Sequence, residues 1–405
     1  MQPNDIEEET TCCIVGSGPA GAMLALLLAR QGVQVMLLEE HMDFDRDFRG
    51  DTIHPSTMEI LDQIGLADKL LRLDHTCIEY IPVQTTRGVV RLADLGLLKT
   101  RFHYITMLPQ ARFLEFITDE ARRYPNFNLR LGARVEKLIE EDGYVHGVQY
   151  RGQDGWHTVR AVLTVGADGR FSRTRKLAGF EPVKTSPPMD VLWFRLPRLA
   201  TETEESDGRL ASGHVLVKLN RGDAWQIGYV IHKGGYQEIR EAGIERLRQD
   251  IAKALPELAD RVETIQAWKQ VSVLSVESSH LRRWYRPGLL LIGDAAHVMT
   301  PIGGVGINYA IQDAVTAANV LGDDLNAGKA RTRDLATVQR KRTWPTRIIQ
   351  AFQNIVQKQV LRRALATDQP LTISPMLLFL LHLPVIRTLP ARFIGFGPWP
   401  VRVKE

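Results

Sequence analysis

The sequence is poor in cysteine and contains no long apolar run. Its three cysteines, Cys12, Cys13 and Cys77, are an odd number without disulfide or metal-ligand spacing, and the adjacent pair sits in an apolar run that favours burial. No window approaches the ~20 apolar residues that a membrane-spanning helix needs. The acidic N-terminus also lacks the apolar centre of a secretory signal. These absences predict a cytoplasmic protein with reduced thiols.

Strong charge and metal-ligand clusters are missing too. The formal net charge is only +4 over 405 residues, so the composition gives no reason to expect a nucleic-acid partner. The 11 histidines show no spacing typical of metal ligands, so we expect no metal site. Repeats and low-complexity segments are also absent, and the length allows two or three packed domains. Local motifs must therefore indicate the function.

The first motif is a βαβ unit. The β-prone run 10–15 leads directly into GSGPAG at 16–21, a helical pattern follows, and a second buried strand at 33–38 ends at Glu39. Glycines at this spacing allow a tight turn, close approach of a pyrophosphate and close packing of helix on strand. The helix N-terminus attracts phosphate, Glu39 suits a ribose diol, and Glu40 disfavours a ribose phosphate. The unit predicts a dinucleotide site without deciding between NAD and FAD.

Two later segments combine a buried strand with a polar or glycine-rich turn. The strand run 161–166 enters the turn Asp168-Gly169, and a short basic helix start follows. A second strand, 288–292, ends at Asp294, and a glycine-rich loop at 301–308 then precedes an Ala-rich helix. Such a loop lets backbone amides approach a flat ligand, while the carboxylate suits a ribityl hydroxyl. These features favour FAD over NAD.

Together, the three segments resemble the fingerprints of a known family. GSGPAG at 16–21, ADGRFSRTR at 167–175 and GDAAHVMTPIGGVGIN at 293–308 are similar, in order and spacing, to those of the class A flavoprotein monooxygenases, typified by para-hydroxybenzoate hydroxylase. Two positions depart from the common pattern, since Thr300 stands where many members have Pro and Val305 where many have Gln. Neither change removes a backbone donor, so cofactor binding is still expected.

The resemblance implies an α/β fold in three parts. These are a Rossmann-like FAD-binding domain, an inserted β-sheet substrate domain, and C-terminal helices. We predict the first part of the FAD-binding domain at 1–180, the substrate sheet at 181–280, the second part of the FAD-binding domain at 281–330, and the helical tail at 331–405.

The resemblance also implies roles for individual residues. Arg49 would lie near the flavin and its phosphates, Gln110 and more weakly Arg112 near the ribityl-pyrophosphate region, and Val135 near adenine. Asp168 would serve both FAD and the nicotinamide cofactor. Simpler alternatives are a surface arginine for Arg49, helix-end residues for Gln110 and Arg112, and a turn residue for Asp168. The other implied cofactor contacts are Gly16, Gly18, Ala20, Gly21, Glu39, Glu40, Gly293, Asp294, Gly304, Gly306, Ile307 and Asn308.

The implied reaction is oxygenation. No second GxGxxG unit is present, so NADPH or NADH would dock transiently and reduce FAD, as in the family. O₂ would then form a flavin hydroperoxide that hydroxylates or epoxidises an aromatic, polyketide-like or lipophilic small molecule. No residue is required as a catalytic base. A halogenase or reductase of the same fold is an alternative, although the GWxWxIP element of halogenases is absent, and a flavin-binding redox carrier or sensor is another.

The region between the second and third fingerprints alternates like a sheet. We expect strands at 190–196, 214–219, 224–231 and 267–276, with a helical run at 236–255. Alternation places an aromatic side chain and an arginine on one face of the first strand and aromatic side chains on one face of the third. Such faces suit a planar acidic or phenolic substrate, and packing inside the sheet's core is an equal alternative. The predicted pocket comprises Trp193, Arg195, Trp225, Tyr229, Pro301 and Gly303.

The C-terminal tail has two contrasting parts. Residues 331–363 are strongly basic, with Asp334 as the only acid, and 376–384 is an apolar run. This pattern fits peripheral contact with a membrane. It fits better a pair of helices that pack back on the FAD-binding domain with a solvated charged face, and the apolar segment could also line a pocket for a lipophilic substrate. The sequence leaves the oligomeric state open.

Overall fold

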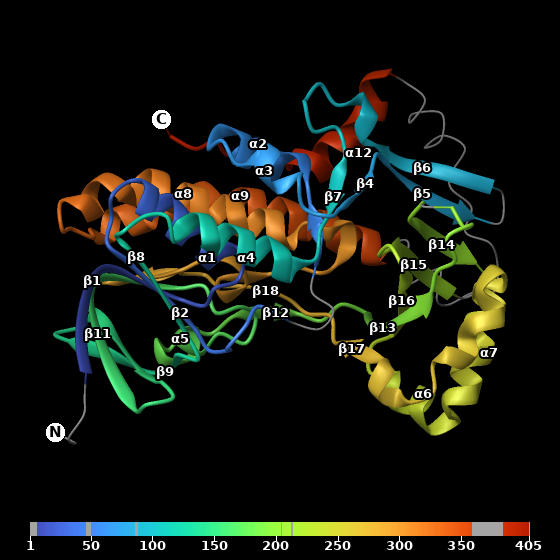
Figure 1. Ribbon diagram of the computed structural model, residues 1–405, viewed down its shortest axis with the longest axis horizontal. Helices are drawn as coiled ribbons and strands as arrows, with labels where there is room; N and C mark the ends of the chain where they lie inside the picture. Colours follow the sequence, from blue (N-terminus) through green and yellow to red (C-terminus); the bar gives the residue numbers. More distant parts are fainter. Residues whose placement is uncertain are drawn as a thin grey trace.

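A computed structural model describes residues 6–45, 50–85, 88–203, 205–211, 214–358 and 384–404. Within these ranges, the chain forms two regions that lie side by side along the long axis of the molecule (Figure 1). One is built on an eight-stranded, mainly parallel sheet and the other on a seven-stranded, mainly antiparallel sheet. This arrangement confirms the predicted α/β class with an additional β-sheet unit.

The larger sheet is that of a nucleotide-binding fold. Its strands run in the order β19-β20-β11-β1-β2-β8, and the hairpin of β9 and β10 is attached to β11. Strands β20, β11, β1, β2 and β8 are parallel, so their carboxyl ends meet at one edge. The bounds are β1 (Ile6–Val15), β2 (Val35–Glu39), β8 (Phe127–Leu131), β9 (Arg134–Glu141), β10 (Tyr144–Arg151), β11 (Trp156–Gly166), β19 (Tyr285–Arg286) and β20 (Leu289–Leu291).

Both faces of this sheet are covered, which explains its continuous apolar runs. Cys12 and Ile14 of β1 face the core under the helices, whereas Cys13 and Val15 face the core under the β9–β10 hairpin. The covering helices are α1 (Pro19–Arg30), α4 (Gln110–Ala121), α8 (Gly306–Asn326) and α9 (Thr332–Val356). Both cysteines of the adjacent pair are fully buried, as predicted.

The second sheet draws its strands from two separate parts of the chain. The order is β17-β13-β16-β15-β14-β5-β6, and β5 pairs in parallel with β14. Residues 80–94 therefore belong to this sheet, although they lie inside the range 1–180 predicted for the FAD-binding domain. The bounds are β5 (Tyr80–Thr85), β6 (Gly88–Asp94), β13 (Met189–Pro197), β14 (Asp207–Ala211), β15 (His214–Asn220), β16 (Ala224–His232) and β17 (Ser272–Leu274).

Helices α6 (Tyr236–Ala242) and α7 (Ile244–Ala254) cover one face of this second sheet, and α12 (Pro384–Phe396) covers the β5–β6 end of the other face. The predicted helical run at 236–255 is broken at Gly243, whose φ of 91° separates α6 from α7. The expected strand at 267–276 is largely replaced by a 3-10 turn, Trp268–Gln270, followed by short β17. The opposite face of the sheet looks toward the larger region. That face is the one available to a ligand bound between the two.

Short elements connect the two regions. One three-stranded sheet contains β3 (Thr52–Ile53), β7 (Ile105–Met107) and β4 (Thr76–Ile78), and another contains β12 (Val183–Thr185), β18 (Ser278–His280) and β21 (His297–Val298). The short helices are α2 (Pro55–Gln63), α3 (Ala67–Leu70) and α5 (Arg173–Leu177). Five 3-10 helices complete the described elements, at Leu95–Leu97, Pro256–Thr264, Trp268–Gln270, Gly293–Ala295 and Ile302–Gly304.

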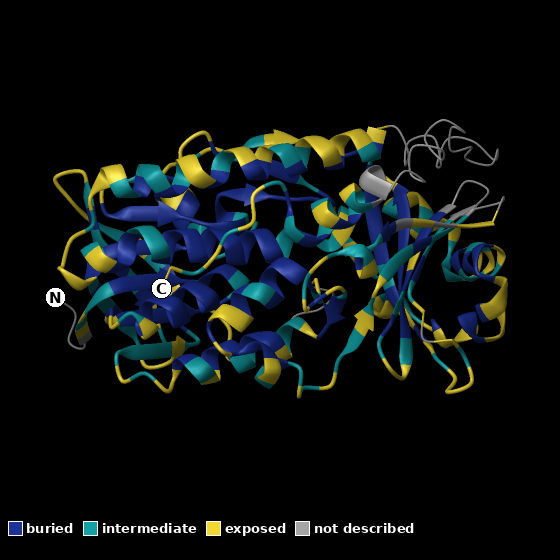
Figure 2. Cartoon of the chain, turned by 90° about the horizontal axis from the view of Figure 1, so that it is seen from above, coloured by how far each residue is buried: buried dark blue, intermediate teal, exposed yellow. Residues whose placement is uncertain are grey.

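The described part of the C-terminal tail packs on the rest of the protein. Leu335 and Val338 of α9 enter the same core as α8, and α12 (Pro384–Phe396) packs beside β6 and α2. The outer side of the long helices is exposed and the inner side buried (Figure 2). No helix in the described ranges is both long and apolar enough to span a membrane. The apolar run at 376–384 lies, except for its last residue, outside the described residues.

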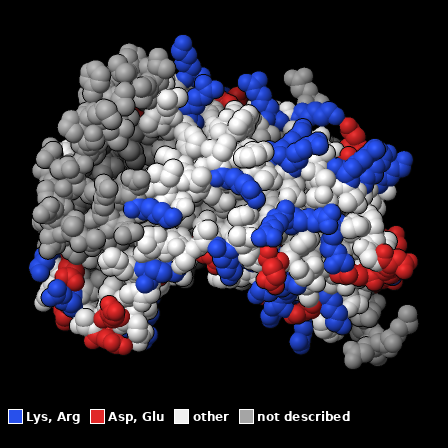
Figure 3. Space-filling model, turned by 180° about the vertical axis from the view of Figure 1, so that it is seen from behind, with Lys and Arg blue, Asp and Glu red and all other residues white. Residues whose placement is uncertain are grey.

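Charge is spread over the surface of the molecule. On the face turned away from the view of Figure 1, Lys and Arg side chains lie in separate places with Asp and Glu between them (Figure 3). Many of the described cations form exposed ion pairs, such as Arg101 with Asp62 and Arg160 with Glu7. Pairs of this kind add little to stability. The candidate site must therefore be sought in buried geometry rather than in surface charge.

Candidate active site

The three fingerprint segments meet at the carboxyl edge of the larger sheet. Backbone hydrogen bonds join their ends directly, because Gly16 N donates to Leu38 O at 2.7 Å and Ala167 N donates to Val15 O at 2.8 Å. Ile292 N, just before the third fingerprint, donates to Gly166 O at 3.0 Å. Segments far apart in the sequence thus form one continuous edge. In open α/β sheets, ligands bind at this edge.

The first turn leaves room for a phosphate. A Cβ on Gly21 would lie 1.9 Å from the carbonyl oxygen of Gly16, and Gly16 itself has a φ of +96°, so both positions need glycine. Gly18 differs, because the nearest atom to an added Cβ would be 4.0 Å away, at Ala167 O. The following helix, α1, begins without a side-chain cap. Its first backbone N–H groups and the open space beside Gly18 therefore fit a pyrophosphate.

Glu39 ends β2 beside this turn. Its carboxylate accepts hydrogen bonds from Ser17 N and Ser17 Oγ, at 2.9 and 2.8 Å, and from His41 N at 3.1 Å. Burial works to raise the pKa of Glu39, but the hydrogen bonds from His41 and Ser17 outweigh burial and lower it. The carboxylate is therefore held ionised at the place where a ribose would lie. Glu40 points to solvent and pairs with Arg134 at 3.2 Å.

The glycine-rich loop is tied to the segment that precedes α2. Thr52 Oγ1 donates to Gly304 O at 2.8 Å, and a Cβ on Gly304 would lie only 2.6 Å from that hydroxyl. The buried Asn308 side chain accepts from His54 N at 2.9 Å and from Thr57 Oγ1 at 2.8 Å. Gly306, at the start of α8, faces open space, and this helix also begins without a side-chain cap. The loop is thus rigid and presents backbone groups to an open side.

The turn that carries Asp294 is held from two sides. Arg175, from the second fingerprint, donates through Nη1 to Ala295 O at 3.1 Å. Asp313, on α8, accepts from Gly293 N at 3.0 Å. Ala20, on α1, packs against the same turn, because a Cβ on Gly293 would lie 3.1 Å from its methyl group. All three fingerprints therefore contribute to the position of this carboxylate.

Other predicted cofactor residues have less direct placements. Asp168 supports the start of α5, because its carboxylate accepts from the N-cap residue Ser172, through Oγ at 2.5 Å, and from Thr174 N at 2.8 Å. Arg112 is an exposed residue paired with Glu115, which matches its simpler interpretation. Val135 is buried in the core, so its side chain is not open to adenine. Gln110 is the half-buried first residue of α4. Ile307 lies beside Gly50. Arg49 is outside the described residues.

The predicted substrate residues are divided between the two faces of the second sheet. Strands β13 and β16 pair Trp193 with Gly228 and Leu196 with Trp225, so the two tryptophans point to opposite faces. Trp225 and Tyr229 lie in the core under α7. The prediction that these two line the pocket is wrong, because period-2 alternation gives a face without saying which face is covered. Trp193 and Arg195 lie on the opposite face, on the side of Ile302 in the glycine-rich loop, and Pro301 and Gly303 of that loop are exposed.

A buried ion pair joins the two regions. Arg221, after β15, lies 2.6 Å from Asp51, which precedes β3. Asp51 also accepts from Gln110 N at 3.0 Å, and Arg221 donates to Gln226 at 2.7 Å. Burial raises the pKa of Asp51, an effect that Arg221 and the nearby Arg195 oppose. This contact fixes the second sheet above the cofactor edge.

Several of these residues were not predicted from the sequence. Asp51, Arg221 and Asp313 lie outside the three fingerprints, and the sequence marks Asp313 only as part of a helix. Only Asp313 is recognisable from the sequence, since it is the one charged residue in the first half of α8. The others depend on contacts between distant parts of the chain, which spacing does not reveal.

The fold and this edge define a class, the FAD-binding oxidoreductases. Residues 9–351 match the family described as FAD binding domain, and the chain belongs to that family. It is 39% identical over 332 residues to 6-methylpretetramide 4-monooxygenase of Streptomyces rimosus, covering 81% of this chain and 77% of the relative. It is 24% identical to para-nitrophenol 4-monooxygenase of a Pseudomonas strain, covering 82% of each.

Solved structures give the same fold. A p-nitrophenol 4-monooxygenase of Pseudomonas putida superposes with a TM-score of 0.78 at 22% identity, covering 97% of this chain and all of the other. The anhydrotetracycline hydroxylase of Streptomyces rimosus superposes with a TM-score of 0.73 at 24% identity, covering 98% and 77%. The chain is thus an FAD-dependent monooxygenase of the para-hydroxybenzoate hydroxylase type, with NAD(P)H as reductant and O₂ and a small molecule as partners.

Proposed function

We propose that the protein hydroxylates a polycyclic aromatic molecule of polyketide type, bound between FAD and the second sheet. Two relatives support this substrate class, the 6-methylpretetramide enzyme and, at 28% identity over 353 residues, a 12-dehydrotetracycline and anhydrotetracycline monooxygenase. The chain spans 65% of the latter's length. The proposal transfers their substrate class to this chain, while the exact compound and the position of oxygenation are left to experiment.

The observation that carries the proposal is a row of cross-strand residues on the second sheet that no helix of the described residues covers. On one side of it, Val191 and Val230 pack with Ile302 of the glycine-rich loop, and on the other side Arg221 binds Asp51. In the row between, Gly228 is paired with Val217 and is buried under the Trp193 ring, whereas Val217 is 36% exposed. A flat apolar surface beside the cofactor edge suits a planar ring system.

Trp193 forms the floor of this row. Its indole lies against the backbone at Gly228, where a Cβ would be only 2.8 Å from the ring. The indole N–H is buried without a hydrogen-bond partner among the described residues. Buried donors normally have a partner, so this one is suited to a carbonyl or phenol oxygen of a substrate.

Arg195 supplies charge at the end of the same row. It is near enough to Arg221 and Asp51 for its charge to act on both, so two guanidinium groups share the surroundings of one carboxylate there. The excess positive charge favours an ionised phenol or enol, which is also the electron-rich form that electrophilic oxygenation requires. We therefore assign Arg195 to binding and orienting the acidic edge of the substrate.

The cofactor set follows from the strand edge. The α1 N-terminus and Glu39 would hold the ADP half of FAD, Asp294 the ribityl chain, and the loop from Gly304 to Asn308 the flavin ring. Hydride acceptance from NAD(P)H and activation of O₂ belong to bound FAD. The chain's own residues bind and orient the reactants and keep water away from them.

The test is turnover of candidate substrates with isotopically labelled O₂. Purified protein with FAD and NADPH is given pretetramide-type and tetracycline-type compounds and simple phenols, and products are read by mass spectrometry. We expect one labelled oxygen in a polycyclic product and NADPH consumption that rises with that substrate. Incorporation of halide instead of oxygen, or no response to any polycyclic compound, would contradict the proposal.

Variants of the row of cross-strand residues sharpen this test. Arg195→Met is expected to raise KM for the substrate roughly tenfold. Arg246→Met is the matched control, since Arg246 is an exposed residue of α7 on the far side of the sheet. Equal KM values for both variants would remove Arg195 from the site.

A further inference from the structure

A buried cluster of charge lies directly behind the turn that carries Asp294. Asp313 is fully buried, and Arg342 and His297 are only 1% and 2% exposed. One oxygen of Asp313 accepts from Arg342 Nε at 2.7 Å. The other accepts from Gly293 N at 3.0 Å and lies 2.6 Å from His297 Nε2. A single carboxylate thus connects α8, α9 and the turn.

The position of this carboxylate depends on its cationic partner. Burial alone would raise the pKa of Asp313, but His297 and Arg342 outweigh burial and lower it. Asp313 is therefore held ionised by its two partners. Since Gly293 and Asp294 are adjacent, any rotation of the Asp313 carboxylate would release the N–H of the turn and shift the Asp294 side chain.

The cluster is poorly designed for stability alone. Both Nη atoms of Arg342 are buried without a hydrogen-bond partner among the described residues. Burying a guanidinium with unsatisfied N–H groups opposes folding, and apolar side chains of similar size often stabilise such a position as well or better. A buried ion pair of this kind is better explained by a requirement for fixed geometry.

Helix α9 also holds the chain beyond the turn. Gln350 Nε2 donates to Val298 O at 2.9 Å, and Gln353 Nε2 donates to Thr300 O at 3.0 Å and to Ile302 O at 2.8 Å. One helix, C-terminal to all three fingerprints, therefore fixes the whole segment from the Asp294 turn to the glycine-rich loop.

We propose that Arg342 is a positioning residue of the FAD site, acting through Asp313 on the turn that presents Asp294. The proposal rests on the assignment of Asp294 to the ribityl chain. It gives α9, which the sequence marks only as a basic tail, a part in cofactor binding. Loss of Arg342 would then weaken FAD binding in protein that remains folded.

The experiment is a titration of the FAD-free protein with FAD, followed by flavin fluorescence and the visible spectrum. Arg342→Met is expected to raise the Kd for FAD about tenfold or more and to shift the flavin bands. Arg342→Lys keeps the charge but loses the planar fork, and its Kd is expected to lie between those of wild type and Arg342→Met. Circular dichroism of the FAD-free variants establishes that they are folded.

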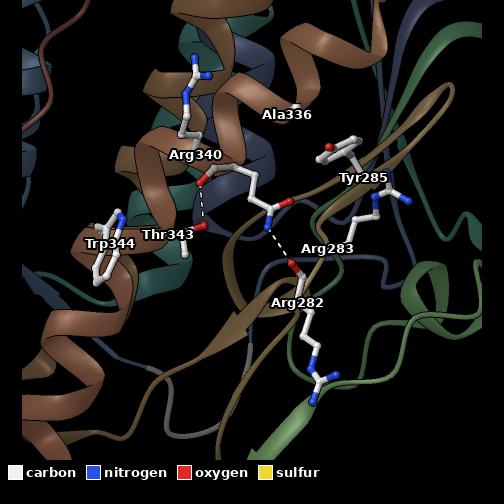
Figure 4. A pocket seen from close by; sticks show the side chains of 8 residues that line it. Arg282, Arg283, Tyr285, Ala336, Arg340, Thr343 and Trp344 are labelled. Atoms are coloured by element: carbon white, nitrogen blue, oxygen red, sulfur yellow. Dashed lines mark hydrogen bonds between the residues drawn. The ribbon is translucent and has the colours of Figure 1, made fainter.

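Arg340→Met is the matched control. Arg340 lies two residues earlier on α9, on the outer side of the helix, where it lines an open hollow of about 390 Å³ with Arg282, Arg283 and Trp344 (Figure 4). The same chemical change there leaves the turn untouched, so FAD affinity should equal that of wild type.

The outcomes separate this proposal from the proposed function. If Arg342→Met does not fold, the Kd for FAD of Arg342→Lys tests the positioning role instead. A wild-type Kd for FAD in either folded variant, or an equal loss in Arg340→Met, overturns the positioning role. A wild-type protein that binds no FAD would contradict the proposed function instead.

Discussion

The two large sheets of this protein serve their ligands in different ways. The parallel sheet uses the ends of its strands, where Gly16, Glu39 and Asp294 come together whatever the side chains along the strands are. The antiparallel sheet uses one face, where Trp193 and Arg195 are placed by strand pairing. The first kind of site is built mainly from backbone and can be read as motifs, whereas the second is built from side chains and depends on register.

Substitutions in the first turn should give the largest effect. Gly21→Val places side-chain atoms where a Cβ alone would already be 1.9 Å from Gly16 O, so we expect loss of FAD binding and of most folded protein. Gly18→Ala meets nothing closer than 4.0 Å and should fold normally, with weaker FAD binding. Yield, circular dichroism and FAD content measure both. Normal FAD content in Gly21→Val would contradict the view that this part of the site is built mainly from closely packed backbone.

The contact between the regions should come next. Arg221→Met leaves Asp51 buried without its cation, and removal of one partner of such a pair lowers the free energy of unfolding by about 3 kcal/mol. The double variant Arg221→Met/Asp51→Asn buries no unpaired charge and should recover most of this loss. Urea denaturation tests both. A double variant as unstable as the single would show that the pair does not act as a unit.

Acid should weaken the cofactor region through His54. Burial lowers the pKa of this imidazole from 6.5 to about 4, and its Nδ1 lies 2.8 Å from Ile394 O. Because the unfolded state binds the proton more readily, this contribution is complete above pH 6.5 and falls as the pH drops toward 4, by about 3 kcal/mol. His54→Asn should flatten that part of the stability–pH curve. An unchanged curve would remove His54 as its source.

The smallest effects are expected from two tryptophan variants that distinguish the roles of the two faces of the second sheet. Trp225→Leu removes a fully buried ring and should lower the free energy of unfolding by about 2–3 kcal/mol, with KM for the substrate unchanged. Trp193→Leu should change stability by under about 1 kcal/mol and raise KM. Denaturation and steady-state kinetics on both variants make the comparison. A raised KM in Trp225→Leu with an unchanged KM in Trp193→Leu would place the substrate on the face under α7 and contradict the proposed site.

Sequence patterns predicted the first region better than the second for physical reasons. The turn at Gly16 and the strands around it follow from local chain geometry, and the predicted strands at 190–196 and 224–231 match β13 and β16 closely. Periodicity could not tell that Trp225 lies under α7, because that depends on which face the helices cover.

Contacts between distant parts of the chain were equally hidden. Arg221 meets Asp51, and Arg342 meets Asp313, only after the chain has folded. In the sequence, each cation has the same appearance as an arginine on the surface. Charge patterns alone therefore cannot separate a positioning arginine such as Arg342 from an exposed one such as Arg340.

The pairing of β5 with β14 has a consequence for how the chain folds. The second sheet is complete only when residues 80–94 meet strands made much later, so its contacts are strongly non-local. Non-local and parallel pairings form slowly, because a long loop must close before they contribute stability. During synthesis, β5 and β6 wait with unpaired strand edges, which are sites of aggregation. Slow assembly of this sheet, more than instability of the finished protein, is therefore expected to limit recovery of soluble enzyme.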